Sequence, residues 1–137
     1  MGRYVEQIDG LIARLRKARA RAVINDIVEI AADMHFHTRA VTVRLVDDRW
    51  EIVEIRMGHR WDAARDREPT KFDIATLNQQ AADLLASIDT DGVRSGALAT
   101  PNRDGSFELT AFFNGSLVQS AINDVSRALS RVFGAAK

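Results

Sequence analysis

The sequence predicts a single α+β domain in which helices pack mainly on one face of a four-stranded antiparallel sheet. Three observations favour this fold class. Segments near both ends and in the middle of the chain repeat their apolar residues every three or four positions, which is typical of helices. Two intervening stretches alternate apolar and polar residues, and each contains a turn signal. The predicted order over residues 1–137 is therefore α-β-β-α-β-β-α, and each helix must bury one apolar stripe.

Composition limits the classes of function. A chain of 137 residues with 46% hydrophobic residues can bury a core without covalent cross-links. It has no cysteine, which excludes disulfides and thiolate metal sites and favours a cytoplasmic location. No apolar run approaches the ~18 residues of a membrane span, so we expect no membrane partner. The formal charge is 0, so no overall field attracts a polyanion, and nucleic acid is not an expected partner.

The first helix is predicted from Tyr4 to about Asp33. Its β-branched second half keeps helical spacing, although the composition also allows a break near Asn25. We expect the apolar stripe of its first half to pair with the last helix or with a second copy in a homodimer. The residues of this stripe follow one another at steps of four and three: Tyr4, Ile8, Leu11, Leu15, Ala18 and Ala22.

The first hairpin follows, because the apolar period changes to two. Strands are predicted over 41–46 and from Trp50 to Met57, with a turn at Asp47-Asp48-Arg49. The alternation slips at Ile52, where two apolar residues become adjacent. This slip predicts a β-bulge or a strand that is apolar on both faces.

A long polar loop over residues 58–71 separates this hairpin from the middle helix. Loops of this length in compact domains are often functional. Thr70 and Asp73 have the spacing of a capping box and predict the start of the middle helix. We expect that helix to end at Asp91-Gly92.

The second hairpin and the last helix complete the domain. Strands are predicted over 97–100 and from Phe107 to Phe113, around a turn at Asp104-Gly105. The last helix is predicted from Ser116 to Phe133, with another stripe at steps of four and three, and Gly134 closes it.

His35-Phe36-His37 is the segment that most suggests chemistry. Two histidines can ligate a metal, but no third ligand lies at a characteristic spacing, so we predict neither a metal nor a cofactor. Nucleophile elbows, phosphate-binding loops and redox pairs are also missing from the sequence, and no catalytic residue is predicted. A small-ligand enzyme with His37 or His59 as general base stays open as an alternative, since histidine titrates near neutral pH.

Basic residues concentrate on the first helix and could neutralise phosphates. On a helical wheel Arg14, Lys17 and Arg21 line one flank of the apolar stripe, whereas Arg16 and Arg19 lie toward the other. This division favours solvated edges or interface charges over one face that follows a phosphate backbone.

The predicted partner-binding residues lie on the first hairpin and the loop after it. Trp61 is a large aromatic among charged residues, which suits either a cap on the core or an anchor for a partner. The acidic residues of the hairpin can complement a basic partner or form a solvated strand face. The whole set is Asp47, Asp48, Glu51, Glu54, His59, Arg60, Trp61, Asp62 and Arg65.

The two strands of the first hairpin, the helix ending near Gly92, and the run from Phe107 to Asn114 after Asp104-Gly105 together resemble the YezG-type immunity proteins of bacterial polymorphic toxin systems. The resemblance implies a non-catalytic protein that neutralises a cognate toxin domain by occluding its active site. It further implies that the carboxylates of the first hairpin face a basic toxin site. The long basic first helix departs from that family.

A secretion-chaperone-like dimer is the alternative function. Such a protein also combines terminal helices with a central antiparallel sheet in a chain of this size. It would use the apolar stripes of both terminal helices to hold a segment of a secreted client. These chaperones are usually more acidic than this chain.

Overall fold

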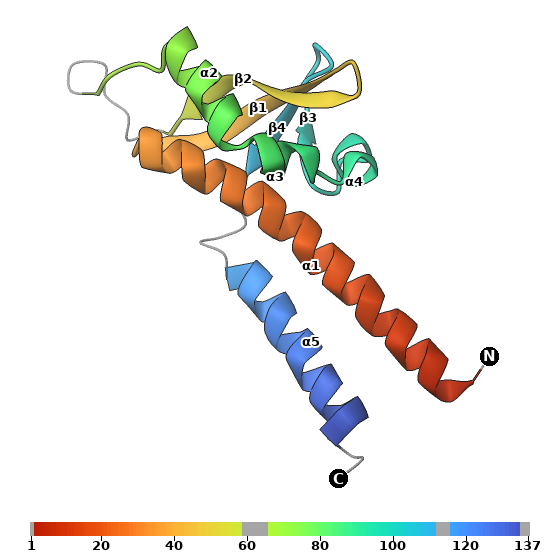
Figure 1. The fold of residues 1–137 in the computed structure, drawn as a ribbon. Helices are drawn as coiled ribbons and strands as arrows, with labels where there is room; N and C mark the ends of the chain where they lie inside the picture. Colours follow the sequence, from red (N-terminus) through yellow and green to blue (C-terminus); the bar gives the residue numbers. More distant parts are fainter. Residues whose placement is uncertain (1, 59–65, 112–115, 135–137) are drawn as a thin grey trace.

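The structure, a computed structural model, describes residues 2–58, 66–111 and 116–134, with the side chains of 122–131 in the last range. It is a single α+β fold, as predicted (Figure 1). The sheet has four antiparallel strands in the order β2-β1-β4-β3. The elements are α1 (Arg3–Met34), β1 (Thr38–Val46), β2 (Arg49–Met57), α2 (Lys71–Gln80), α3 (Ala82–Ala86), α4 (Thr90–Arg94), β3 (Thr100–Pro101), β4 (Phe107–Thr110) and α5 (Ser116–Gly134).

α1 is one continuous helix of 32 residues, so the sequence-based break near Asn25 is wrong. Asn25 is buried in the helix and donates a hydrogen bond of 3.0 Å from Nδ2 to Glu29 Oε1, one turn further on. Its neighbours Ile24 and Ile27 are fully buried in the core. Tertiary packing therefore outweighs the weak helix propensity of this β-branched segment.

The first hairpin confirms both features predicted from its pattern. Asp47 and Asp48 have φ angles of 49° and 62°, which make a two-residue turn with the twist that suits a hairpin. The register changes from Thr42 opposite Glu54 to Val43 opposite Ile52, which leaves one extra residue in β2. This is the predicted β-bulge.

The middle helix is only partly as predicted. The capping box of Thr70 and Asp73 is present and begins α2. The chain then breaks into three helices, and Asp91 and Gly92 lie inside α4 instead of at a helix end. Asp89 explains the new start, because its side chain accepts a hydrogen bond of 3.2 Å from Gly92 N. Glycine at position 92 lets Leu98 pack closely against α4, because a Cβ at this position would lie 2.5 Å from Leu98 Cδ1.

The second hairpin is shorter than predicted. Its turn is confirmed, with Gly105 at a φ of 87°. The first strand is only Thr100–Pro101, because residues 97–99 bend back toward α4, where Leu98 N donates a hydrogen bond of 3.0 Å to Gly92 O. The second strand ends at Thr110, one residue before Ala111, and residues 112–113 of its predicted range lie outside the described residues.

The core lies between the sheet and the helices that cover it. α1 contacts β1 and β4, while α2 and α3 contact β2. Inward side chains of the strands, such as Val41, Val43 and Leu109, are fully buried against these helices.

The free edge of β2 is closed by a side chain. Asn78 of α2 accepts a hydrogen bond of 2.8 Å from Ile52 N and donates one of 2.9 Å to Ile52 O. The amide thus replaces a neighbouring strand at the middle of this edge. Exposed strand edges invite pairing with other chains, so Asn78 protects β2 against it.

Candidate functional site

The first half of α1 and the helix α5 pair as a two-helix arm that extends away from the sheet (Figure 1). Leu11 and Ala18 of α1 and Val125 of α5 are buried between the two helices. This confirms that the terminal helices pair with each other. We call residues 3–22 together with α5 the arm.

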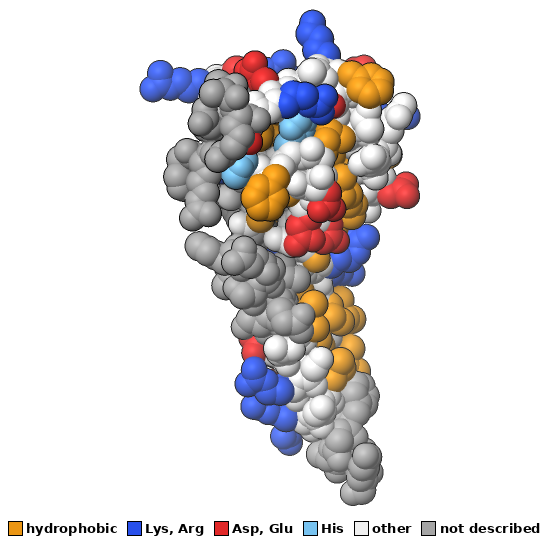
Figure 2. All heavy atoms as spheres, turned by 90° about the vertical axis from the view of Figure 1, so that its left-hand side faces the viewer, with side chains coloured by type: hydrophobic (Ala, Val, Ile, Leu, Met, Phe, Trp, Pro, Cys, Tyr) orange, Lys and Arg blue, Asp and Glu red, His pale blue; other side chains and the backbone are white. Residues whose placement is uncertain are grey.

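The predicted apolar stripe of α1 is divided by this pairing. Leu11 and Ala18 face α5, whereas other large apolar residues remain on the surface. Exposed side chains of α1 and α5 form what we call the arm stripe, and each is 36–72% exposed. Hydrophobic side chains gather along one side of the arm in Figure 2. The arm stripe consists of Tyr4, Val5, Ile8, Ile12, Leu15, Ile122 and Leu129.

A groove rich in cations lies between the same two helices. Its volume is about 430 Å³, and we call it the basic groove. Lysine and arginine side chains lie along the side of the arm opposite the hydrophobic ones in Figure 2. The lining residues are Arg14, Lys17, Ala18 and Arg21 of α1 with Asp124, Arg127, Ala128 and Arg131 of α5.

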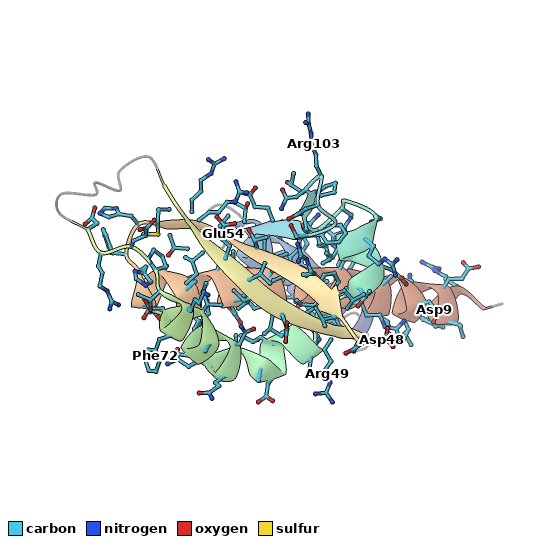
Figure 3. All side chains as sticks on the ribbon, turned by 90° about the horizontal axis from the view of Figure 1, so that it is seen from above. Asp9, Asp48, Arg49, Glu54, Phe72 and Arg103 are labelled. Atoms are coloured by element: carbon cyan, nitrogen blue, oxygen red, sulfur yellow. The ribbon has the colours of Figure 1, made fainter. Side chains whose placement is uncertain are left out.

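The acidic residues of the first hairpin, Asp47, Asp48, Glu51 and Glu54, are all exposed. Figure 3 shows Asp48 beside Arg49 at the tip of the hairpin, with Glu54 further along β2. Asp48 and Glu51 line a groove of about 740 Å³ beside α2 and α3. Glu54 lines another groove of about 390 Å³ together with Glu68. The structure therefore spreads these carboxylates over more than one surface and intersperses them with arginines.

The predicted residues of the following loop, His59, Arg60, Trp61, Asp62 and Arg65, lie outside the described residues. The described residues on either side of that segment, Gly58 and Asp66, both lie close to His37. Gly58 N donates a hydrogen bond of 2.7 Å to His37 O, and Asp66 Oδ2 lies 3.7 Å from His37 Nε2. Of these two contacts, only the one from Gly58 is a hydrogen bond.

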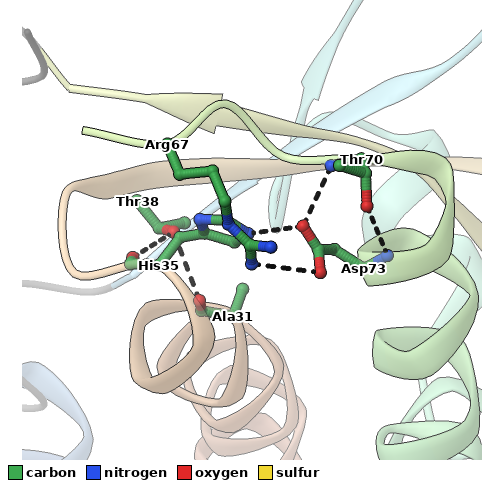
Figure 4. Close-up of polar contacts among 6 residues, drawn as sticks. All are labelled: Ala31, His35, Thr38, Arg67, Thr70 and Asp73. Atoms are coloured by element: carbon green, nitrogen blue, oxygen red, sulfur yellow. Dashed lines mark hydrogen bonds and ion pairs between the residues drawn. The ribbon is translucent and has the colours of Figure 1, made fainter. Parts of the chain in front are cut away.

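His35 and Asp73 form a buried contact where α1 ends and α2 begins (Figure 4). His35 Nε2 lies 3.1 Å from Asp73 Oδ2, and both side chains are at most 9% exposed. Thr70 N donates a hydrogen bond of 3.0 Å to the same carboxylate, and Arg67 lies 3.4 Å from its other oxygen. The hydrogen bond from Thr70 N lowers the pKa of Asp73, helped by His35 and Arg67 and opposed by burial.

These contacts indicate a structural role for both histidines. Thr38 Oγ1 donates a hydrogen bond of 2.6 Å to the carbonyl oxygen of His35, which fixes the exit from α1. His35 and His37 bind different aspartates, so they do not converge on one point. Across the part of the chain that the structure describes, no group of three potential ligands could hold a metal ion.

Sequence reasoning missed two exposed phenylalanines beside this contact. Phe36 and Phe72 are 87% and 78% exposed, and they are the chain neighbours of His35 and Asp73. We call the surface around Phe36 and Phe72 the junction. Both residues interrupt polar stretches, which was a usable signal. Asn78 was also missed, and an isolated asparagine on a helix gives no signal for such a role.

Comparison with known proteins finds no matching family model, no matching curated protein and no matching solved structure. Among the helices described, none has the length and apolar character needed to cross a membrane. The function is therefore inferred from the surfaces of the molecule.

Proposed function

We propose that this chain is a non-catalytic binding protein that works as a homodimer joined through the arm. The observation that carries this proposal is the arm stripe, whose seven large apolar side chains lie exposed on one side of two paired helices. Single exposed apolar residues are ordinary on protein surfaces. A contiguous patch with a polar border is typical of an interface.

A second copy of the chain can pack on the arm stripe, because the spacing of the stripe residues along α1 is symmetric. Val5, Ile8, Ile12 and Leu15 follow one another at steps of three, four and three, which read the same in both directions. Antiparallel pairing of two α1 helices about residue 10 places Ile8 opposite Ile12 of the second copy. The same register places Val5 opposite Leu15. Such an interface uses one patch twice, as two-fold dimers do.

The residues at the border of the arm stripe are also consistent with this antiparallel register. Tyr4 comes to the level of Arg16 of the second copy, and a guanidinium over an aromatic ring contributes about 0.5–1 kcal/mol at an exposed site. Tyr4 is the most exposed member of the stripe. A second copy that covers the ring of Tyr4 would explain why a large aromatic residue occupies this exposed position.

The test compares two neighbouring substitutions, Ile12→Glu in the stripe and Ala13→Glu beside it on the exposed helix surface. Light scattering on a gel-filtration column should give the wild type and Ala13→Glu twice the chain mass of 15.2 kDa. Ile12→Glu should give the single chain mass with unchanged circular dichroism, because dimerisation would bury an unpaired charge. A wild type that stays monomeric at about 100 µM, a concentration far above a micromolar Kd, contradicts the proposal.

A second candidate function adds a protein partner at the junction, and exposed Phe36 and Phe72 favour it. Aromatic residues are enriched in the cores of interfaces. The buried contact between His35 and Asp73 holds the chain next to both rings, so little ordering is needed on binding. The resemblance to immunity proteins suggests a toxin domain as this partner.

The test of the second candidate is affinity capture from cells that encode the chain. The captured protein should arrest growth when expressed alone, and co-expression of this chain should restore growth. Phe72→Ala should weaken the capture at least tenfold, because removing an interface anchor costs about 2 kcal/mol or more. Arg103→Ala, at the tip of the second hairpin (Figure 3), should leave it unchanged. A partner without toxicity, or equal capture by both variants, contradicts the toxin assignment.

A further inference from the structure

The basic groove contains like charges that do not stabilise the fold. Arg14, Lys17 and Arg21 follow one another at steps of three and four, and Arg127 and Arg131 are four apart. Like charges at these spacings destabilise a helix by about 0.2–0.5 kcal/mol per pair. Here two such rows also line the same groove from facing helices. An anionic ligand would turn this repulsion into attraction.

The acidic residues of the groove do not neutralise it. Asp124 is the one carboxylate among the described lining residues, and it lies 3.4 Å from Arg127. Arg21 is engaged in an interaction of its own. Among the side chains that the structure describes, no carboxylate forms an ion pair within 4.0 Å of Arg14, Lys17 or Arg131. The groove therefore keeps an excess of positive charge.

We propose that the basic groove binds the phosphodiester backbone of a nucleic acid. Four of the five cations among its described lining residues are arginines, whose planar fork matches phosphate oxygens. Arg14 and Arg21 are seven residues apart, about 10 Å along the helix. A duplex carries about three phosphates of one strand over that length of its axis, at ~3.4 Å of axis each.

The lining residues also indicate how the nucleic acid is recognised. None of the lining residues that the structure describes is aromatic, so these residues offer no surface on which a base stacks. Ala18 and Ala128 are small and leave room between the two rows of cations. The groove therefore recognises the backbone without reading the base sequence.

The pairing of α1 with α5 changes the sequence-based expectation that nucleic acid is not a partner. The sequence places Arg14, Lys17 and Arg21 on one flank of a single helix, which reads as a solvated edge. The structure adds Arg127 and Arg131 from across the groove. Because the formal charge of the chain is 0, the attraction is local to this groove. This inference is independent of the homodimer, which would use the other side of the arm.

The test is fluorescence anisotropy with a labelled mixed-sequence duplex DNA of about 20 base pairs, beginning at ~50 mM salt, where phosphate contacts are strong. The groove variant is Arg14→Gln with Lys17→Gln. The control, Arg49→Gln with Arg103→Gln, removes the same charge from exposed positions outside the arm. The groove variant should bind at least tenfold more weakly, and the control should bind within twofold of the wild type.

The salt dependence gives a second readout that a folding defect would not produce. Each lost phosphate contact lowers the slope of log K against log salt by about 0.9, so the groove variant should lose up to about 1.8. Inorganic triphosphate is the competing probe. The proposal is overturned if the wild type does not bind the duplex, if both double variants lose affinity equally, or if triphosphate binds more tightly than the duplex.

Discussion

Replacing Asp73 by asparagine tests the contact that joins α1 to α2. The substitution keeps the size of the side chain but removes its charge. It also replaces one acceptor oxygen by an NH₂ group. In the wild type the carboxylate accepts hydrogen bonds from Thr70 N at 3.0 Å and His35 Nε2 at 3.1 Å, and it lies 3.4 Å from Arg67. Asparagine cannot satisfy all of these donors at once.

The expected loss of stability follows from these contacts. A hydrogen bond to a charged group contributes about 1.5–3 kcal/mol, and a buried donor left without an acceptor costs about 1–3 kcal/mol. The amide oxygen of the introduced asparagine can still accept one hydrogen bond as part of the helix cap, which limits the loss. We expect Asp73→Asn to lower the free energy of unfolding by about 2–4 kcal/mol at pH 7.

The pH dependence has a definite sign. The pKa of Asp73 is lowered in the folded protein, chiefly by the hydrogen bond from Thr70 N. Its stabilisation is therefore fully present above the unfolded pKa of about 3.9 and is lost as the pH falls through the folded value. Asparagine does not titrate, so the difference between wild type and variant should narrow between about pH 5 and pH 3.

Urea unfolding followed by circular dichroism measures both effects. Asp83→Asn, on the exposed surface of α3, is the matched control and should change stability by less than about 0.5 kcal/mol at any pH. The reasoning is refuted if Asp73→Asn costs no more than this control. A loss that keeps the same size at pH 3 would also refute it.

Two further predictions concern the edge and the tip of the first hairpin. Asn78→Ala should destabilise the protein by about 1–3 kcal/mol in thermal or urea unfolding, because it leaves the backbone groups of Ile52 without their partner; an unchanged midpoint would show that water replaces the amide without cost. Asp48→Val should cost about 1–2 kcal/mol because of the φ of 62°, whereas Asp48→Gly should be neutral or stabilising; equal effects of the two variants would show that the turn does not need this conformation.

Short sequence patterns predicted much of the fold. The helical spacing from Tyr4 onward, the capping box of Thr70 with Asp73, and the turn at Asp104-Gly105 each specify structure within a few residues. The slip at Ile52 even predicted the bulge. The breaks between α2, α3 and α4 were missed, although the start of α4 has a local signal in the cap at Asp89.

The candidate sites were harder to predict because they depend on distant residues. His35 meets Asp73 across 38 positions, and no spacing rule connects them. The basic groove needs Arg127 from α5 beside Arg14 from α1. The division of the α1 stripe likewise appears only when α5 covers Leu11. Trp61, which the sequence favoured, lies outside the described residues.

The most direct test of the central claim is an intermolecular distance between spin labels. The chain has no cysteine, so Asp26→Cys on the exposed side of α1 provides one labelling site per copy. Antiparallel pairing about residue 10 separates the two labels by 32 helical positions, about 48 Å at ~1.5 Å per residue. Double electron–electron resonance should give a distance near that value. A signal without intermolecular coupling, or a distance below about 25 Å as parallel pairing would give, contradicts the homodimer proposed here.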